Sequence, residues 1–464
     1  MMKPVKPKSR QGRTGVLGLA RGFRSDILSA LPDKLYRAWM AEFKTPFFKS
    51  IVANDPALVK LVLKQRPLDF PKSDYLGNGL RPLLRDSVFL TNGAAWQRQR
   101  RIIDPAFEGG RLRQSYPQMY DAAQGLVSRI TTGPQEFEER ASAYAADVIF
   151  RTLFSVPIDS DIARDIFQEF RKHQAAQPIV NLGGVLRLPR WVPRFYRPAA
   201  VTSARRIRAL IEKLTRERAR AIADGTAPQD LATKIMTTPD PETGKCFDWD
   251  EMVDQVAIFF LAGHETSASA LAWALYLLAA HPEWQDHLYT ESQILSGDFS
   301  SLSQLRQTRA VFRETLRLYP PVPMMVRETC QSENLRNRHY DRGLQVVISP
   351  WHLHRHQRLW DNPDGFDPDR WTTDNGRQCQ RDAYIPFSAG PRVCPGAGFA
   401  MAEGVVALAM LVRHYRFDLC SDRIPQPVAR LTVRSKNGIW LNVIPRDQSW
   451  WDWPSACVIY HVRT

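Results

Sequence analysis

The pattern of apolar and polar positions predicts a mainly helical fold with small β-sheets. The longest apolar pattern runs over residues 248–280. Asp248 can cap its first turn, with Glu251 completing a box-like arrangement, and His281-Pro282 ends it. At about 1.5 Å per residue, this helix is roughly 45 Å long. Because apolar residues cover nearly all of its faces, we expect a buried central helix.

Shorter patterns predict further elements on both sides of this helix. Helices are expected over residues 57–64, 92–101, 200–224, 309–319 and 397–415, and strands over residues 47–52 and 438–444. The many Arg and Lys residues of the helix over residues 200–224 indicate a solvent-facing element. The rest of the first half is interpreted as an alternation of short strand-like and helical signals.

No stretch has the composition of a flexible linker, because Gly and Ser do not gather between two apolar blocks. We therefore predict a single domain over residues 31–446. A basic, partly disordered arm over residues 1–30 precedes it, and an atypical tail over residues 447–464 follows it. Apolar residues make up 44% and charged residues 24% of the chain, as is ordinary for a soluble globular protein.

The formal net charge of +15 is scattered, with a local concentration near the N-terminus. No aromatic residues interleave with that basic run, so we expect no nucleic-acid surface. The apolar run over residues 15–20 is too short for a signal-peptide core, and nothing approaches a spanning helix of roughly 20 apolar residues. We expect a cytoplasmic monomer without an integral membrane segment.

The six cysteines are far apart and form no Cys-x-x-Cys pair. This spacing disfavours a disulfide framework or a zinc site and fits a reducing compartment.

One cysteine lies in a glycine-punctuated loop, Phe-Ser-Ala-Gly-Pro-Arg-Val-Cys-Pro-Gly, over residues 387–396. A thiolate that binds haem iron favours O–O cleavage, and it needs N–H donors or positive charge to stay deprotonated. Gly390 and Gly396 allow a tight loop that aims backbone amides at Cys394, and the following helix presents its positive end to the sulfur. Phe387 can pack beside a porphyrin, and Arg392 can meet a propionate.

The pattern Phe-x-x-Gly-x-Arg-x-Cys-x-Gly resembles the haem-binding signature of the cytochrome P450 family, with every fixed position present. The resemblance implies the P450 fold, with haem b between the central helix and the cysteine-loop helix, and Cys394 as the axial ligand of the iron. It implies a haem-thiolate monooxygenase that inserts one atom of dioxygen into an apolar organic substrate. The missing membrane anchor is typical of soluble, bacterial-type members.

Ala262-Gly263-His264-Glu265-Thr266, midway along the central helix, resembles the acid–alcohol motif of the same family. A carboxylate beside a hydroxyl in an apolar helix is costly unless it has a task. Ala262 and Gly263 are expected at the haem, where the glycine leaves room. Glu265 and Thr266 can relay protons to dioxygen as it is reduced. His264 is expected to turn toward a neighbouring helix and not to bind the metal.

Glu314 and Arg317 share a helix face, and buried together they need a third partner, for which Arg370 is the candidate. This set resembles the structural triad of the family, which holds the cysteine loop. Trp96 and Arg100 also share a helix face and can both donate to a propionate. Arg327 resembles a further propionate-binding residue, although a surface position is an equal alternative.

The chain has no room for a flavin or iron–sulfur domain, so its electrons have to come from a separate protein. We expect a ferredoxin with its NAD(P)H-dependent reductase, or a flavodoxin-type donor. An acidic donor can dock on the cysteine side, where Arg98, Arg101, Arg381 and Arg413 supply positive charge.

Two other hypotheses stay open from the residues alone. One is peroxide-driven oxygenation or isomerisation, which needs no proton relay, and the other is a non-catalytic haem sensor or carrier. The substrate itself is not readable, because residues 74–90 and 174–189, the segments expected to select it, carry no diagnostic chemistry.

Overall fold

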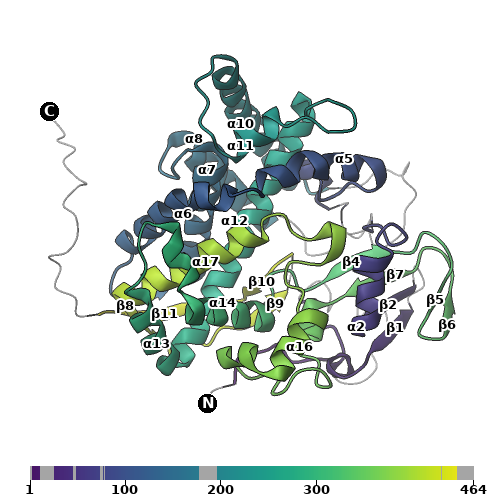
Figure 1. Ribbon diagram of the computed structural model, residues 1–464. Coiled ribbons are helices and arrows are strands. Elements are labelled where there is room, and N and C mark those ends of the chain that lie inside the picture. The colour runs from purple at the N-terminus through teal and green to yellow at the C-terminus, as the bar shows by residue number, and fades with distance from the viewer. Residues whose placement is uncertain are drawn as a thin grey trace.

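The computed structural model describes residues 3–10, 26–44, 49–73, 77, 79–176, 196–429 and 431–446. Helices make up most of the molecule, and small sheets lie beside and below them (Figure 1). The longer helices are α5 (Gly93–Ile103), α6 (Arg111–Ser128), α7 (Phe137–Phe154), α8 (Asp161–Ala176), α10 (Pro198–Ala223), α12 (Trp249–Ala280), α13 (Pro282–Ser292), α14 (Arg306–Leu318) and α17 (Ala397–His414). The shorter helical segments are η1 (Asp33–Tyr36), α2 (Pro56–Lys60), η2 (Leu61–Gln65), α4 (Arg81–Leu84), η3 (Asp104–Ala106), α11 (Leu231–Thr237), η4 (Phe299–Ser303), α15 (Pro350–Leu353), η5 (Pro368–Thr372), α16 (Asp374–Asp382) and η6 (Gly390–Arg392).

The strands of the described residues form four small sheets. The largest has the order β1 (Met40–Lys44), β2 (Lys49–Ala53), β7 (Gln345–Ile348), β4 (Met325–Glu328), and only its β2–β7 pair is parallel. The others are the antiparallel set β3 (Gly133–Glu136), β11 (Trp440–Pro445), β8 (Tyr415–Leu419) and the pairs β5 (Glu333–Leu335) with β6 (Arg338–Tyr340) and β9 (Pro427–Ala429) with β10 (Val433–Ser435). The largest sheet joins the beginning of the chain to its second half, because β2 pairs with β7.

Helix α12 crosses the middle of the molecule, as the apolar pattern predicts. A capping box begins it: the Glu251 N–H donates to the Asp248 carboxylate at 2.8 Å, and the Asp248 N–H donates to the Glu251 carboxylate at 3.0 Å. It ends at Ala280, before Pro282. It packs against α7, α10, α14 and α17, so most of its side chains are buried.

Two polar residues near the start of α12 anchor the segment that follows α4. The Asp254 carboxylate accepts from the Asp86 N–H at 3.0 Å, and the Gln255 side-chain oxygen accepts from the Val88 N–H at 2.9 Å. Backbone groups in such a loop need partners when they are buried. These side chains therefore fix residues 85–90 against the central helix.

Residues 111–176 form the long helices α6, α7 and α8 with one short strand, β3, between the first two, where an alternation of short signals was predicted. Helix α7 is buried on several sides, with twelve of its residues shielded from solvent. Its apolar positions therefore follow no single stripe, and the helical period is hard to see in the sequence.

The N-terminal arm packs against the domain where it is described. The Tyr319 hydroxyl donates to the Val5 carbonyl at 2.7 Å. Lys6 Nζ lies 2.6 Å from the Asp364 carboxylate and 4.8 Å from the centre of the Tyr36 ring. Residues 3–10 thus differ from the predicted solvated arm, because these distant partners cannot be recognised in the sequence.

Several predictions fall outside the described residues: the tail over residues 447–464, the apolar run over residues 15–20 and most of residues 174–189. Within the described residues, α17 is long and apolar enough to cross a membrane, and 67% of it is buried inside the protein.

Candidate active site

The cysteine loop is closed by backbone hydrogen bonds. The Cys394 N–H donates to the Phe387 carbonyl at 2.9 Å, and the Val393 N–H donates to the Gly390 carbonyl at 3.0 Å. Cys394 is exposed to solvent, although surrounding protein buries its sulfur on most sides. We infer that it forms the floor of a recess whose other wall is α12. Burial raises the pKa of its thiol, and the Gly396 N–H and the Arg100 charge act in the opposite direction.

Gly390 is required by its surroundings, since its φ is +69° and a Cβ would lie 2.0 Å from the Leu63 carbonyl oxygen. The loop therefore rests directly on η2. A Cβ on Gly396, by contrast, would approach Cys394 Sγ only to 3.9 Å, an ordinary contact. Gly396 thus contributes its N–H to the sulfur, and only Gly390 meets the predicted need for glycine.

Opposite the cysteine loop, α12 has one open face in an otherwise buried helix. Phe259, Ala262 and Thr266 are partly or fully exposed, and their spacing of three and four residues places them on one side. The Thr266 hydroxyl donates back to the Ala262 carbonyl at 2.6 Å. The apolar walls and this single hydroxyl make the open face a surface for an apolar ligand.

Phe107 connects this face with the cysteine-loop helix. Its ring centre lies 6.0 Å from that of Phe259 on α12 and 5.4 Å from that of Phe399 on α17. The aromatic contacts fix the relative positions of the two helices that enclose the recess.

The expected role of Gly263 needs correction. A Cβ at this position would lie 2.3 Å from Ile149 Cδ1 on α7, so the glycine lets α7 pack closely and does not make room at the open face. The neighbouring His264 turns to α7 as well, with its Nε2 2.9 Å from the Ser142 hydroxyl. Burial lowers the pKa of His264 to about 3, with smaller contributions from Arg434 and Arg171, so the ring is neutral.

The Glu265 carboxylate lies away from the Thr266 hydroxyl. It accepts a hydrogen bond from the Thr432 hydroxyl at 2.9 Å and lies 3.5 Å from the Arg434 guanidinium. Thr432 directly precedes β10, so the carboxylate is fixed on the side of the β9–β10 pair. Of the two residues predicted to relay protons, only Thr266 reaches the open face in this conformation.

Sequence reasoning missed Glu403 on α17. This buried carboxyl group accepts a hydrogen bond from the Ser267 hydroxyl, next to Thr266, and burial raises its pKa to about 8. The Tyr144 hydroxyl donates to the Glu403 backbone carbonyl at 2.9 Å. Glu403 thereby connects α17 with α12 and α7, and its position in an apolar run was the signal that could have revealed it.

Positive groups gather beside the recess. The Arg392 guanidinium lies 4.8 Å and Lys72 Nζ lies 6.0 Å from the Trp96 ring. Arg100 donates to the Val393 carbonyl at 2.7 Å. Burial lowers the pKa of Lys72 to about 6, and Arg392, Arg327 and Arg100 lower it further. Burial and Arg392 lower the pKa of Arg327 to about 10.

These residues fit the propionates of haem. Buried like charges are costly without an anion, and the Nε atoms of Arg327 and Arg392 are buried without a hydrogen-bond partner among the described residues. The predicted set of Trp96, Arg100, Arg327 and Arg392 is thus brought together. Lys72 was missed, because only the fold places it beside β4.

The predicted triad also comes together, at 0 to 3% exposure. Arg317 Nε and Nη2 donate to Glu314 at 2.9 and 2.8 Å, and Arg370 Nε donates to Glu314 at 3.0 Å. The same two guanidinium groups also donate to the backbone carbonyls of residues 354, 361, 362, 363 and 365. The triad therefore holds the segment that leads into the cysteine loop.

Comparisons with known proteins agree with this geometry. The family model described as "Cytochrome P450" matches residues 32–442. A cyclooctat-9-en-7-ol 5-monooxygenase of Streptomyces melanosporofaciens is 33% identical over 79% of this chain and 80% of its own. Cytochrome P450 714B1 of Oryza sativa subsp. japonica is 30% identical over 90% of this chain and 82% of its own.

A crystal structure of the heme domain of a triple mutant of cytochrome P450DA superposes with a TM-score of 0.75 at 25% identity, over 88% of this chain and 90% of that chain. Because relatives come from bacteria and eukaryotes alike, the bacterial-type assignment stays a prediction.

Proposed function

The chain belongs to the cytochrome P450 family and is a monooxygenase, and from this premise we propose that it oxidises an apolar organic substrate with electrons from a separate protein. The observation that carries the proposal is the recess between Cys394 and the open face of α12, with cationic groups beside it. Haem bound there supplies the activation of dioxygen.

The residues of the chain bind the haem, keep the sulfur deprotonated and place protons and apolar surface at the site. The Gly396 N–H and the positive end of α17 favour the deprotonated Cys394 sulfur against the opposing effect of burial. Thr266 keeps one hydroxyl proton on an otherwise apolar face, where Glu265 can supply a second proton only after leaving Thr432. Val322 and Met324, exposed or half-buried, add apolar surface from the segment before β4.

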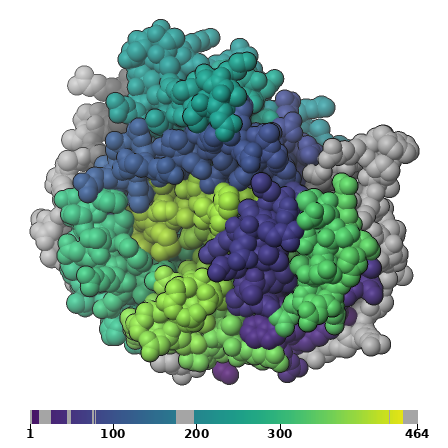
Figure 2. Space-filling view, turned by 45° about the vertical axis from the view of Figure 1, so that its right-hand side comes forward, coloured from purple at the N-terminus to yellow at the C-terminus, as the bar shows by residue number. Residues whose placement is uncertain are grey.

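We infer that an acidic ferredoxin, itself reduced by an NAD(P)H-dependent reductase, docks on the cysteine side. Figure 2 shows this face, where α17 in yellow-green lies between the blue region of α6 and the purple region of α2 and η2. Exposed Lys64, Arg113 and Arg381 lie on η2, α6 and α16 around it.

Two of the arginines predicted to attract the donor are engaged by carboxylates of the chain itself. Arg98 lies 2.5 Å from Glu251, and Arg101 lies 2.6 Å from Asp240. We therefore assign the docking charge to Lys64, Arg113 and Arg381. Lys64→Glu is expected to slow reduction by ferredoxin at low salt, whereas Lys213→Glu on α10 is not, and a rate insensitive to ionic strength contradicts this assignment.

The function is tested by the absorption of the reduced, carbon monoxide-bound protein and by NADPH-dependent turnover with ferredoxin and its reductase. Cys394→Ala is expected to abolish the strongly red-shifted band and the turnover. Cys330→Ala, which removes an exposed thiol elsewhere, is expected to keep both. A red-shifted band that survives in Cys394→Ala refutes the ligand assignment, and product formed equally well from hydrogen peroxide alone favours peroxide-driven chemistry. We further infer that the protein is a cytoplasmic monomer.

A further inference from the structure

The side chain of His354 connects two segments that are 31 residues apart in the chain. Its ring is fully buried at the end of α15. The Ile385 N–H donates to His354 Nε2 at 2.9 Å. Ile385 lies two residues before Phe387, where the cysteine loop begins. A buried ring nitrogen thus fixes a backbone amide directly before this loop.

The backbone of His354 is held by the triad. Its carbonyl accepts a hydrogen bond from Arg317 Nη1 at 2.8 Å, and Arg317 Nε donates to Glu314 at 2.9 Å. The His354 N–H donates to the Pro350 carbonyl at 2.8 Å. This one residue therefore joins the buried ion pairs, through its carbonyl, to the segment before the cysteine loop, through its ring.

Two backbone hydrogen bonds continue from Ile385 to the cysteine. The Ser388 N–H donates to the Ile385 carbonyl at 3.1 Å. The Cys394 N–H donates to the carbonyl of the preceding residue of this turn, Phe387, at 2.9 Å. Ser388 has a φ of +63°, a left-handed conformation that a non-glycine residue keeps only where its surroundings hold it. A displaced Ile385 peptide would therefore release this turn and change the direction of the Cys394 sulfur.

The ring of His354 suits this role because it stays neutral. Burial lowers the pKa of His354 to about 3, and the Arg317 charge acts in the same direction. A neutral imidazole has one accepting and one donating nitrogen, so acceptance at Nε2 places the ring proton on Nδ1. The Tyr384 ring packs beside it, with 5.3 Å between the ring centres. The acceptor is thus available throughout the neutral range of pH.

We propose that His354 is a positioning residue for Cys394, whose ring nitrogen extends the support of the triad to the cysteine loop and keeps the sulfur in the direction that iron binding requires. The proposal rests on the assignment of Cys394 as the iron ligand in the proposed function. Without the ring nitrogen, the buried Ile385 N–H loses its acceptor, which is costly. The triad itself stays intact in that case.

Two variants of His354 separate the acceptor from the shape of the ring. His354→Phe keeps a buried ring without an acceptor, whereas His354→Gln keeps an acceptor near the position of Nε2. The reduced, carbon monoxide-bound protein is followed in urea, at the same fraction of each variant's unfolding midpoint, while the strongly red-shifted band gives way to an unshifted band. His354→Phe is expected to speed this conversion about tenfold. His354→Gln is expected to restore most of the wild-type rate.

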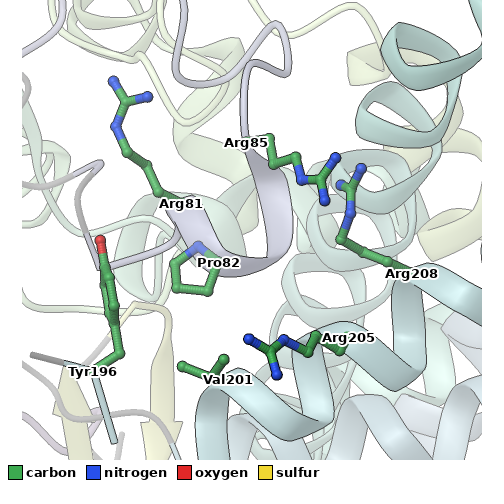
Figure 3. Close-up of a pocket in the computed structure, with 7 residues that line it drawn as sticks. All are labelled: Arg81, Pro82, Arg85, Tyr196, Val201, Arg205 and Arg208. Carbon is green, nitrogen blue, oxygen red and sulfur yellow. The ribbon is translucent and has the colours of Figure 1, made fainter.

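Two controls distinguish positioning from a general loss of packing. His352→Phe removes another buried histidine of the same segment, whose Nδ1 lies 2.8 Å from the Ser349 hydroxyl. It is expected to lower stability without speeding the conversion. Arg205→Gln changes an exposed residue beside a pocket between α4 and α10 (Figure 3). Because α10 packs against α4, α8, α11 and α12, this variant is expected to match wild type.

Amide hydrogen exchange of the haem-loaded protein tests the contact itself. The Ile385 amide is expected to be protected in wild type and in His354→Gln and to exchange faster in His354→Phe. If His354→Phe does not fold, wild type and His354→Gln still decide the question. An Ile385 amide that exchanges in wild type as fast as an exposed one overturns the proposal.

The remaining outcomes separate this proposal from the proposed function. The proposal is wrong if His354→Phe converts no faster than His352→Phe. It is also wrong if His354→Gln converts as fast as His354→Phe, because the ring then acts by its shape alone. A red-shifted band that survives in Cys394→Ala removes the ligand of the proposed function, and with it the role of His354 for the sulfur. The exchange rate at Ile385 then still tells a failed ligand assignment from a failed contact.

Discussion

Removal of the Glu314 carboxylate is expected to destabilise the protein strongly and to lower its haem content. Glu314 is fully buried and accepts three hydrogen bonds from Arg317 and Arg370 and one from the Asp367 N–H. In Glu314→Ala two guanidinium groups stay buried without their anion. Breaking a buried ion pair in this way costs about 3–5 kcal/mol. The freed arginines then hold residues 354–365 less firmly, and with them the path into the cysteine loop.

Urea unfolding followed by circular dichroism measures the free energy of unfolding, and the pyridine haemochrome gives haem per protein. Glu314→Gln keeps the shape of the side chain and one acceptor, so its free energy of unfolding and its haem content are expected to lie between those of wild type and Glu314→Ala. This variant keeps the prediction testable if Glu314→Ala does not fold. Glu212→Ala, which breaks an exposed pair with Arg216, is the control and is expected to change little. The reasoning is refuted if Glu314→Ala loses no more stability than Glu212→Ala, or if it binds haem normally despite its lost stability.

Three further predictions concern the recess. Gly390→Ala is expected to remove the red-shifted carbon monoxide band because its Cβ meets a carbonyl oxygen, whereas Gly398→Ala, whose Cβ comes no closer than 3.8 Å to a neighbouring side chain, is expected to keep it. Burial raises the pKa of Glu403 from 4.5 to about 8, so the contribution of its neutral form to stability is complete below pH 4.5 and is lost as the pH rises toward 8. In urea titrations at several pH values, Glu403→Gln is expected to flatten this loss of stability. A variant with the same pH profile as wild type contradicts the prediction. Thr266→Ala is expected to keep haem but to divert NADPH electrons into hydrogen peroxide, with Thr266→Ser restoring coupling, and an unchanged product-to-NADPH ratio argues against a role for the hydroxyl.

The local signals in the sequence predicted the ends of the helices near the site accurately. The Asp248–Glu251 box and Pro282 delimited α12, and the predicted helix over residues 397–415 matches α17 within one residue. Helix boundaries depend on caps and prolines, which are local. The π-helical turn η2 could not be expected, because nothing in residues 61–65 distinguishes it from a continuing α-helix.

The remaining features depend on partners that are distant in the chain. Lys72 joins the cationic groups only because β4 and the cysteine loop come next to it, and Gly263 is required by Ile149 on another helix. Glu265 was placed correctly on α12, but the direction of its carboxylate follows from Thr432, far along the chain. Motifs thus predicted which residues gather at the site, while orientation and charge balance required the fold.

The contacts of the N-terminal segment affect how the protein can be shortened. Val5 accepts the hydroxyl of Tyr319 at the end of α14, and Lys6 pairs with Asp364, next to the carbonyl of Pro363 that Arg317 binds. Deleting the first ten residues for easier expression would therefore remove contacts that stabilise the segment around Asp364, to which the triad also binds. A version that lacks these ten residues should lose haem during purification more readily than the full chain.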